Sequence, residues 1–450
     1  MSKVYKIKKG LDIPLLGEAE KVVRQAEPAQ YYGVKPIDFH WMRTKLLARE
    51  GDRVKAGSPL FFNKLQPDVQ FPSPVSGKVV SVNRGERRKI LEVVIEADSK
   101  MEYEDYGRAE PGDMQRGEVT DKLLKSGLWA FIRQRPYSVS ANPKDTPKSI
   151  FISGFDTAPL APDNDLVVKD EQENFQRGID ALSKLTDGTI HLNLNAEYPP
   201  SEVFTRAKGV QHNYFKGPHP AGNVGVQINR IDPINQGDLI WYIYPQDVIT
   251  IGRLFEKGIY DASKIVALTG SEVEKPLYYR VLRGTSVKPL VDNNVNKGDL
   301  RYISGNVLTG KQINSEGYVG FFDDQITVIP EGRYHELFGW AMPGFNKFST
   351  SRSFFSWLRP NKKYRLDTNL KGGERAYVMS GEYEKVCPLD IYPVQLIKAI
   401  MIGDIELMEK LGIYEVDEED FALCEFVCTS KTPVQSIVRK GLNMMIEEMT

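Results

Sequence analysis

Residues 71–88 read FPSPVSGKVVSVNRGERR, and this stretch decides the fold of the N-terminal part of the chain. Valine and serine alternate along it, and Gly85 ends the strand that the alternation predicts. The preceding segment 49–61, REGDRVKAGSPLF, has two glycine turns before an apolar strand, and segment 90–98, ILEVVIEAD, alternates again. Short strands joined by glycine turns predict a small barrel-sandwich over residues 1–100.

This order of strands and turns resembles the lipoyl- and biotin-carrier barrels, which present one lysine on a hairpin for covalent modification. In lipoyl domains that lysine lies about midway between a strand leucine and the Ser-Pro of the return strand. Here the interval is 60–73, and its middle is Gln66-Pro67. Lys64 lies nearby, but its neighbours are asparagine and leucine, unlike those of the carriers. We therefore expect an unmodified scaffold.

The composition of the 450-residue chain is that of a globular protein with several cores, since 41% of residues are hydrophobic and 26% charged. The formal net charge is -1 and no basic run stands out, so we expect no nucleic-acid partner. Three cysteines near the C-terminus form no disulfide framework, which indicates a reducing cytoplasm. The start, MSKVYKIKKG, lacks the apolar core of a signal peptide, and no stretch approaches the ~18 apolar residues of a membrane-spanning helix.

Three further domains follow the barrel. Residues 101–257 alternate strand and helix patterns, which predicts an α/β domain, and the segment TDKLLKSGLWAFI predicts a helix whose N-cap is Thr120 or Asp121. Residues 258–330 contain two strands around a turn, a short helix and a closing strand, an order typical of a β-grasp domain. An aromatic connector and helices occupy residues 331–450, so the fold class is multidomain α+β.

The common nucleotide-binding fingerprints are absent from the sequence. No two glycines are separated by a single residue, so neither the dinucleotide fingerprint nor the P-loop occurs. The loop GPHPAGNVG, residues 217–225, offers backbone amides to an anion, although a rigid inter-element loop explains it better. His212 and His219 lack a metal-ligand spacing, and Asp323-Asp324 fits a turn better than an acid/base pair.

Four long motifs in order resemble the A subunits of Na+-translocating NADH:quinone reductases. They are KIKKGLDIPLLGEAE (6–20), HPAGNVGVQINRIDP (219–233), GWAMPGFNKFSTSRS (339–353) and YEKVCPLDIYPVQLIKAIMIGD (383–404). More distantly, the α/β domain followed by a β-grasp domain of the SLBB type is similar to the flavin-carrying subunit of respiratory complex I and to the C subunit of the Rnf complex.

The cofactor motifs of those relatives are not kept. Their flavin loop reads roughly G-x-G-G-A-G-F-P, whereas this chain has SGLWAFIRQRPY at residues 126–137, and its large side chains block the close approach that a flavin phosphate needs. Of the cysteines that ligate iron–sulfur clusters in the Rnf relative, only Cys387, Cys424 and Cys428 remain. We expect a C-terminal ferredoxin-like helical remnant without a cluster, an incomplete or zinc site being the alternative.

The resemblance implies a cytoplasmic, peripheral subunit of a six-subunit enzyme at the bacterial inner membrane. It implies that NADH, FAD, FMN and iron centres are bound by other subunits, that ubiquinone is the substrate, and that the isolated chain is inactive with no cofactor, metal or catalytic residue of its own. The chain would contribute to quinone binding and to assembly with the membrane subunits. The alternatives are a soluble small-molecule or anion-binding protein outside any membrane complex and, third, a stand-alone dehydrogenase, against which the missing glycines argue.

Two aromatic and basic stretches, YYGVKPIDF (31–39) and WAFIRQRPY (129–137), are candidates for quinone or partner contact, because aromatic faces pack a quinone ring and Arg or Tyr donors bond its carbonyls. Their residues are Tyr31, Tyr32, Lys35, Trp129, Phe131, Arg133, Arg135 and Tyr137; a packed domain junction is the alternative. The connector 339–365 is a candidate docking surface for the membrane subunits, with a connector folded on its own surface as the alternative. Its anchors are Trp340, Phe354, Phe355 and Trp357.

Overall fold

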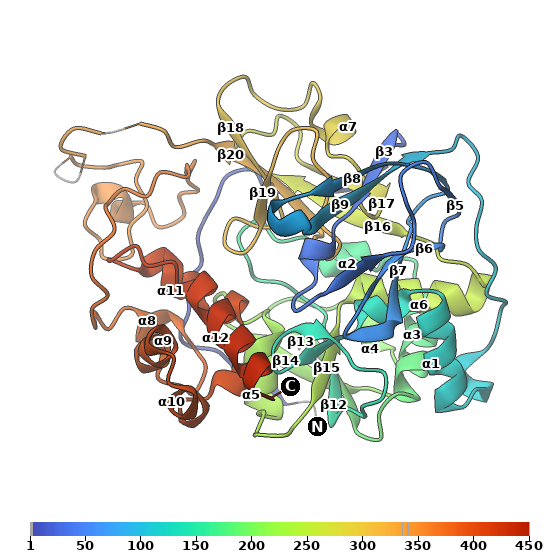
Figure 1. The fold of residues 1–450 in the computed structure, drawn as a ribbon. Coiled ribbons are helices and arrows are strands. Elements are labelled where there is room, and N and C mark those ends of the chain that lie inside the picture. Colours follow the sequence, from blue (N-terminus) through green and yellow to red (C-terminus); the bar gives the residue numbers. More distant parts are fainter. Residues whose placement is uncertain (1–2, 335, 340–341, 450) are drawn as a thin grey trace.

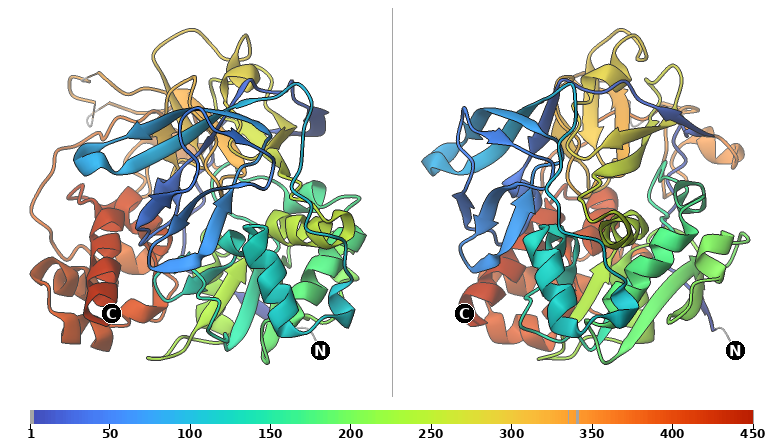
Figure 2. Two further views of the ribbon diagram at one scale, coloured as in Figure 1. Left: turned by 45° about the vertical axis from the view of Figure 1, so that its right-hand side comes forward. Right: turned by 90° about the vertical axis from the view of Figure 1, so that its right-hand side faces the viewer.

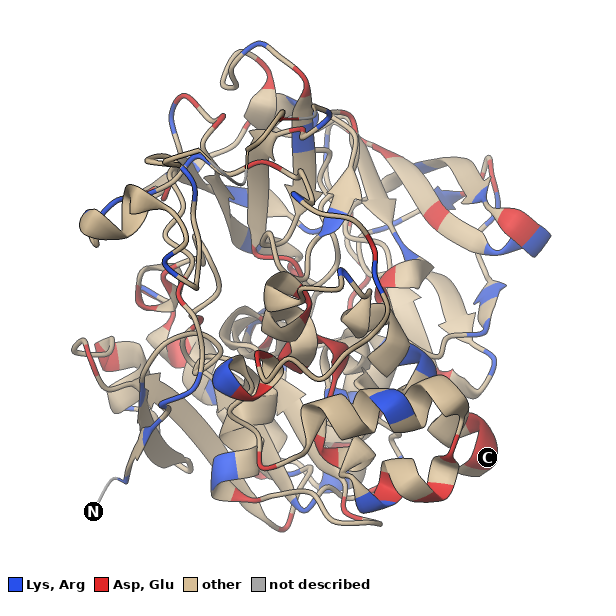
Figure 3. Cartoon of the chain, turned by 90° about the vertical axis from the view of Figure 1, so that its left-hand side faces the viewer, with Lys and Arg blue, Asp and Glu red and all other residues tan. Residues whose placement is uncertain are grey.

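The computed structural model describes residues 3–334, 336–339 and 342–449. Four units pack together, and Figure 1 shows the C-terminal helices beside the α/β unit, with the sheet of the β-grasp unit above it. Figure 2 shows the barrel strands, in blue, over the teal helix α1 of the α/β unit. Figure 3 shows acidic and basic residues interspersed along the ribbon, in keeping with the formal net charge of -1.

The predicted barrel-sandwich is present as two small sheets. One has the order β3-β9-β8-β5 and the other the order β4-β6-β7. Their strands are β3 (Tyr31–Val34), β4 (Thr44–Leu46), β5 (Arg53–Val54), β6 (Pro59–Asn63), β7 (Gln66–Pro72), β8 (Gly77–Arg84) and β9 (Ile90–Ala97). The one-turn helices η1 (Pro36–Asp38) and η2 (Glu86–Arg88) lie between them.

The position expected for the tip of the β6–β7 hairpin was wrong. Gln66 already begins β7, so the turn consists of Lys64 and Leu65. The Asn63 side chain fixes this turn, because its Oδ1 accepts from the backbone N–H groups of Arg43 and Leu65, both at 3.1 Å. The side chain of Lys64 is exposed at the tip.

The first two strands of the chain belong to other units, which the sequence analysis did not predict. β1 (Val4–Lys6) pairs in parallel with β14 (Gln211–Lys216) at the edge of the α/β sheet. β2 (Glu20–Gln25) pairs in parallel with β17 (Leu277–Leu282) in the β-grasp unit. The N-terminal segment therefore ties the two later units together before the barrel begins.

The α/β unit is built on a seven-stranded sheet of order β1-β14-β13-β12-β15-β10-β11. β1, β14, β13, β12 and β15 run parallel, and β10 runs antiparallel to β15. The strands not yet given are β10 (Arg133–Arg135), β11 (Val139–Ser140), β12 (Ser149–Ser153), β13 (Thr189–Asn195) and β15 (Ile240–Ile243). All residues of β12 and β15 are buried, as expected for central parallel strands with both faces covered.

Helices cover both faces of this sheet. They are η3 (Pro111–Asp113), α1 (Arg116–Lys125), η4 (Leu128–Phe131), α2 (Asn164–Val167), α3 (Gln172–Ser183), α4 (Glu202–Thr205), α5 (Val224–Ile231) and α6 (Pro245–Lys257). The expected start of α1 at Thr120 or Asp121 was wrong. The helix begins at Arg116, because the backbone N–H of Gln115 donates to Glu118 at 2.8 Å and caps it further upstream.

The β-grasp unit has the sheet order β19-β18-β20-β16-β17-β2. Its own elements are β16 (Ser263–Thr269), β17, α7 (Lys288–Val291), β18 (Leu300–Ser304), β19 (Lys311–Ile313) and β20 (Gln325–Pro330). β16 pairs antiparallel with β17 and parallel with the closing strand β20. The strands β16 and β17, the helix α7 and the closing strand β20 follow the order that the sequence predicts for residues 258–330, whereas β18, β19 and the added strand β2 were not predicted.

The C-terminal unit is helical and shares a core with the α/β unit. Its helices are η5 (Phe355–Leu358), α8 (Tyr383–Val386), α9 (Pro393–Ile402), α10 (Ile405–Lys410), η6 (Ile413–Glu415), η7 (Glu418–Phe421), α11 (Ala422–Val427) and α12 (Val434–Met449). Leu396 and Phe421 are buried in the same apolar cluster as Phe151 of β12. Within the described ranges, no helix is long and apolar enough to cross a membrane.

Candidate functional site

A cavity of about 210 Å³ lies where the α/β, β-grasp and C-terminal units meet. Phe155 and Asp156 follow β12, and Tyr244 and Pro245 follow β15, so these neighbouring parallel strands deliver their carboxyl ends to one wall. The chain runs from β12 to β13 on one side and later places β15 on the other, so the strand order reverses here. Ligands of open α/β sheets bind at such a switch point.

Arg133 of β10 enters this cavity between aromatic rings. Its guanidinium carbon lies 4.2 Å from the ring centroid of Phe322, 4.6 Å from that of Tyr242 and 5.0 Å from that of Tyr244. Its Nε is buried without a hydrogen-bond partner. Among the described residues the guanidinium has no hydrogen bond or ion pair, so the rings hold the cation while its donors stay available.

The two predicted contact stretches meet behind Arg133 at Phe321 and Phe322. The ring centroid of Phe39 lies 4.9 Å from that of Phe321 and 5.3 Å from that of Phe322. Phe131 stacks on Phe321 at 5.0 Å. The barrel, the α/β unit and the β-grasp unit therefore share one aromatic junction, and Arg133 lies on its cavity side.

Most of the other candidates on the second stretch lie in packed surroundings. Trp129 and Phe131 are fully buried, and the indole N–H of Trp129 donates to the carbonyl oxygen of Ala141 at 2.7 Å. Arg135 is fully buried and bonded to carboxylates of the C-terminal unit. Tyr137 is partly buried beside Tyr414. Of the five, only Arg133 lines the cavity.

The candidates on the first stretch lie elsewhere. Tyr31 is partly exposed in a groove of about 630 Å³ between the barrel and the β-grasp unit. Tyr32 is buried, and burial raises the pKa of its phenol. The Lys35 ammonium is buried and donates to the carbonyl oxygen of Tyr318 at 2.6 Å. These three residues brace the barrel against the β-grasp unit and do not line the cavity that holds Arg133.

The glycine-rich loop 217–225 forms another part of the cavity wall. His219, Gly222 and Asn223 line it. The Nδ1 of His219 lies 3.1 Å from the hydroxyl of Thr157, and burial lowers the pKa of this imidazole to about 4, so it is neutral at physiological pH. Two features that looked unrelated in the sequence, the loop and Arg133, therefore face one space.

Three aspartates on the wall are satisfied by their own surroundings. Asp156 accepts from the backbone N–H of Ala158 at 2.8 Å, and Asp323 accepts from the Ser304 hydroxyl at 2.6 Å. Asp324 forms an ion pair of 2.6 Å with the buried Lys264. Burial raises the pKa values of Asp156 and Asp323. These three aspartates therefore have partners of their own and do not pair with Arg133.

The three cysteines are buried together in the C-terminal unit. The Tyr383 hydroxyl donates to the Cys428 sulfur at 3.0 Å, and a side-chain hydrogen bond with Cys424 lowers the pKa of Cys387. In the described part of the chain, no group of three or more His, Cys, Asp or Glu side chains could hold a metal ion. The expectation that no iron–sulfur cluster binds here, with an incomplete or zinc site as the alternative, stays a prediction.

The predicted docking segment has an exposed aromatic face. Phe355 and Trp357 of η5 are each about half exposed, at 52% and 49%. Phe354 is partly buried, with the Lys347 ammonium 5.3 Å from its ring centroid. Trp340 lies outside the described residues.

The cavity residues that the sequence analysis missed include Tyr244, Phe322 and Glu419. Tyr244 carried a usable signal, because it directly follows a strand of the α/β unit, where binding residues gather. Phe322 and Glu419 carried none, since only the tertiary fold brings them to Arg133.

Comparison with protein families gives three matches along the chain. Residues 5–98 match the NqrA N-terminal barrel-sandwich hybrid domain, residues 114–260 the NqrA second alpha/beta domain, and residues 265–315 the NQRA C-terminal domain of the SLBB model. These spans follow the barrel, the α/β unit and the β-grasp unit of the structure.

Curated relatives match over almost the whole chain. The A subunit of the Na(+)-translocating NADH-quinone reductase of Yersinia pestis bv. Antiqua (strain Angola) is 40% identical, with 99% of this chain and 100% of the relative covered. The proteins of the same name from Neisseria meningitidis and Hahella chejuensis are 39% and 38% identical at the same coverage. Among solved structures, an H2-reduced NAD+-reducing [NiFe]-hydrogenase aligns at a TM-score of 0.39 and 12% identity, with 76% of this chain and 63% of that chain covered, which is too weak to support an argument.

Proposed function

The chain belongs to the family of A subunits of the Na+-translocating NADH-quinone reductase, and on that premise we propose that it binds the quinone head group in the cavity at Arg133. In this proposal the chain is a peripheral subunit on the cytoplasmic face of the bacterial inner membrane. It carries no redox centre; NADH, flavins and iron belong to other subunits of a six-subunit complex, and ubiquinone is the substrate.

The observation that carries this proposal is the free guanidinium of Arg133. The buried arginines of the chain, by contrast, are neutralised, as Arg283 is by Asp247. A cation that keeps its donors unpaired in a cavity favours a ligand with an acceptor oxygen. The rings of Tyr244 and Phe322 lie beside the guanidinium and offer flat apolar faces. A quinone supplies both requirements, because it is a flat ring that bears carbonyl oxygens.

The second candidate ligand is a small anion, because the unpaired cation of Arg133 would attract it. The loop 217–225 lines the same cavity, but the N–H groups of His219, Gly222 and Asn223 already donate to Asp12, Thr157 and Pro220, so Arg133 would be the main donor to the anion. The two ligand classes differ in their apolar surface and in their response to salt, because binding of an anion by a cation weakens as the ionic strength rises. A titration at two salt concentrations therefore separates them.

The test is the dissociation constant of a short-chain ubiquinone for the purified chain, measured by calorimetry. Arg133→Gln removes the guanidinium, and we expect at least tenfold weaker binding. Arg53→Gln is the matched control, because Arg53 lies on the barrel surface and pairs with Asp98 at 2.7 Å. Equal affinity of Arg133→Gln and the wild type, with both proteins folded, would refute the proposal; tighter binding of inorganic phosphate than of quinone would favour the anion.

We further propose that the connector 339–365 docks onto the membrane subunits through Phe355 and Trp357, with Phe354 and Trp340 as neighbouring anchors. The two exposed rings support this, because aromatic side chains concentrate binding energy at interfaces. Arg352, whose guanidinium carbon lies 5.9 Å from the Trp357 ring centroid, adds a positive charge to the same face.

A further inference from the structure

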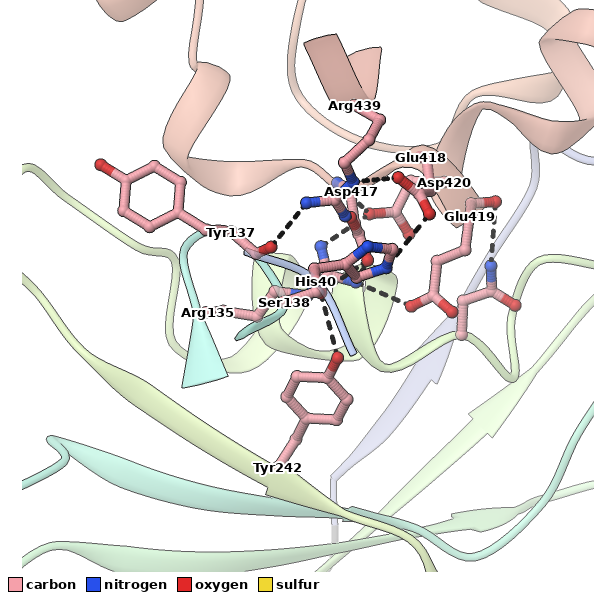
Figure 4. Close-up of polar contacts among 11 residues, drawn as sticks. His40, Arg135, Tyr137, Ser138, Tyr242, Asp417, Glu418, Glu419, Asp420 and Arg439 are labelled. Atoms are coloured by element: carbon pink, nitrogen blue, oxygen red, sulfur yellow. Dashed lines mark hydrogen bonds and ion pairs between the residues drawn. The ribbon is translucent and has the colours of Figure 1, made fainter. Parts of the chain in front are cut away.

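Four consecutive acidic residues, Asp417–Asp420, reach the buried junction between the C-terminal and α/β units (Figure 4). Arg135 faces three of them. Its Nη2 lies 2.7 Å from Glu419 and 3.6 Å from Asp417, and its Nη1 lies 3.2 Å from Asp420. Arg439 of α12 pairs with Asp417 and Glu418. Four carboxyl groups thus share two arginines, so this junction holds more acidic groups than permanent cations.

The two most firmly held carboxylates are identified by their partners. Burial opposes the ionisation of Asp417, but Arg135 and Arg439 outweigh it and hold the pKa of Asp417 well below its usual range. Asp417 also accepts from the Ser138 hydroxyl at 2.5 Å. Glu418 pairs with Arg439, and its Oε1 lies 3.2 Å from the His40 imidazole. The carboxyl groups that have the weaker compensation by cations, and are therefore the candidates to keep a proton, are Glu419 and Asp420.

Glu419 differs from Asp420 in its position. Asp420 is fully enclosed: its Oδ2 accepts from Arg135 and from the backbone N–H of Asp417 at 3.0 Å. Glu419 lines the cavity, where its Oε1 accepts from Arg135 while its Oε2 has no hydrogen bond with the described residues. Burial, followed by the nearby carboxylates, raises the pKa of Glu419 to about 7 against the pull of Arg135. A proton on Oε2 leaves the bond to Arg135 intact.

Several other charged or titratable groups face Glu419 from the surrounding elements. They are Arg133 and Arg135 of β10, Tyr242 of β15 and Tyr244 directly after it, Asp417, Glu418 and Asp420 beside it, Arg439 of α12, His40 of the barrel, Asp156 after β12, His219 before α5, and Asp323 and Asp324 before β20. None of the arginines in this set comes within 4.0 Å of Glu419 except Arg135, as far as the described residues show.

We propose that Glu419 keeps a proton on Oε2 and donates it in a hydrogen bond to a carbonyl of the ligand whose other carbonyl is held by Arg133. This rests on the proposed function and specifies its ligand as a neutral ring with two acceptor oxygens. Arg133 and Glu419 line the same cavity of about 210 Å³ and form no ion pair with each other, so both keep hydrogen-bonding capacity toward a ligand in it. Glu419 is then a specificity-determining residue that also makes binding depend on pH.

The pH dependence has a definite sign. If only the protonated form donates, affinity is constant below the pKa of Glu419 and falls above it, by about tenfold per pH unit. Glu419→Gln keeps an oxygen for Arg135 and carries a permanent N–H donor in place of the proton. We therefore expect this variant to bind a short-chain ubiquinone with an affinity that does not change between about pH 6 and about pH 9.

The experiment measures the dissociation constant of the short-chain ubiquinone against pH for the wild type, for Glu419→Gln and for the control Glu202→Gln, whose side chain is exposed on α4. Calorimetry of the wild type in two buffers of different ionisation enthalpy also counts the protons taken up on binding above about pH 7. We expect uptake approaching one proton per ligand. Quinone binding without proton uptake would overturn this inference and leave the proposed function standing, whereas no quinone binding at any pH would overturn both.

Discussion

The guanidinium of Arg133 and the carboxyl group of Glu419 face the same cavity from two different units without forming an ion pair. Arg133 is held by rings from β15 and the β-grasp unit, whereas Glu419 is held by Arg135. Each group is therefore held in place by residues of a neighbouring unit and keeps hydrogen-bonding capacity toward the cavity. This arrangement, in a member of a quinone reductase family, underlies the binding model.

The buried Arg135 should be essential to the stability of the junction. Arg135→Met leaves Asp417 and Asp420 without their main buried partner, and we expect a loss of roughly 3–5 kcal/mol in the free energy of unfolding. The control Arg53→Met breaks an exposed pair and should cost about 1 kcal/mol or less. Urea unfolding at neutral pH gives both values, and similar losses in the two variants would contradict the assigned role.

Glu419 should also make stability depend on pH. Because its folded pKa of about 7 exceeds the ordinary 4.5, the folded state binds more protons than the unfolded state in that window. Stability therefore falls as pH rises from 4.5 to 7, by at most about 1.4 kcal/mol per unit. Glu419→Gln should remove this slope. Asp417 has the opposite effect on stability. Because its pKa is depressed in the folded state, it stabilises the fold at neutral pH, and this stabilisation is lost only as the pH falls into the acid range.

Unfolding curves at several pH values, with Glu202→Gln as the control, test this prediction without any ligand. An unchanged slope in Glu419→Gln would show that another group holds the proton. The loss of stability at acid pH that is attributed to Asp417 should remain in both variants.

Parts of this account were accessible from sequence, and others were not. The spacing of Phe175, Ile179 and Leu182 predicts α3, because apolar residues that recur at helical spacing within a short segment mark one buried face of a helix. β1 was missed because its three residues are ordered by pairing with β14 more than 200 residues away, as in Val4 with Tyr214. Arg133 was proposed as a contact residue because its stretch mixes aromatic rings with basic donors, a local pattern that suits a quinone. The junction with Glu419 depends on a contact between distant elements that no local pattern encodes.

The exposed rings of η5 should matter for assembly and not for folding. Phe355→Ser combined with Trp357→Ser should reduce co-purification with the membrane subunits, while the thermal midpoint of the free chain changes little because both rings are about half exposed. Tyr198→Ser, at a position 69% exposed on the α/β unit, is the control. Undiminished co-purification would reject the docking role; an unfolded free chain would show instead that these rings stabilise the connector.

The purified chain should be colourless. The segment 128–131, whose side chains we expect to block a flavin phosphate, is a fully buried one-turn helix. Only three cysteines are present, fewer than a cluster with four thiolate ligands requires. A visible absorption spectrum of the chain measures this directly, and stoichiometric flavin or iron absorbance would contradict it.

The central claim, that quinone binds at Arg133, is tested most directly by photolabelling the native complex with a photoreactive quinone and mapping the labelled peptides. The binding model predicts label on peptides that line the cavity, those containing Arg133, Tyr244 or Phe322, and loss of that label in Arg133→Gln. Label confined to the groove at Tyr31, or no label on this chain, would contradict it.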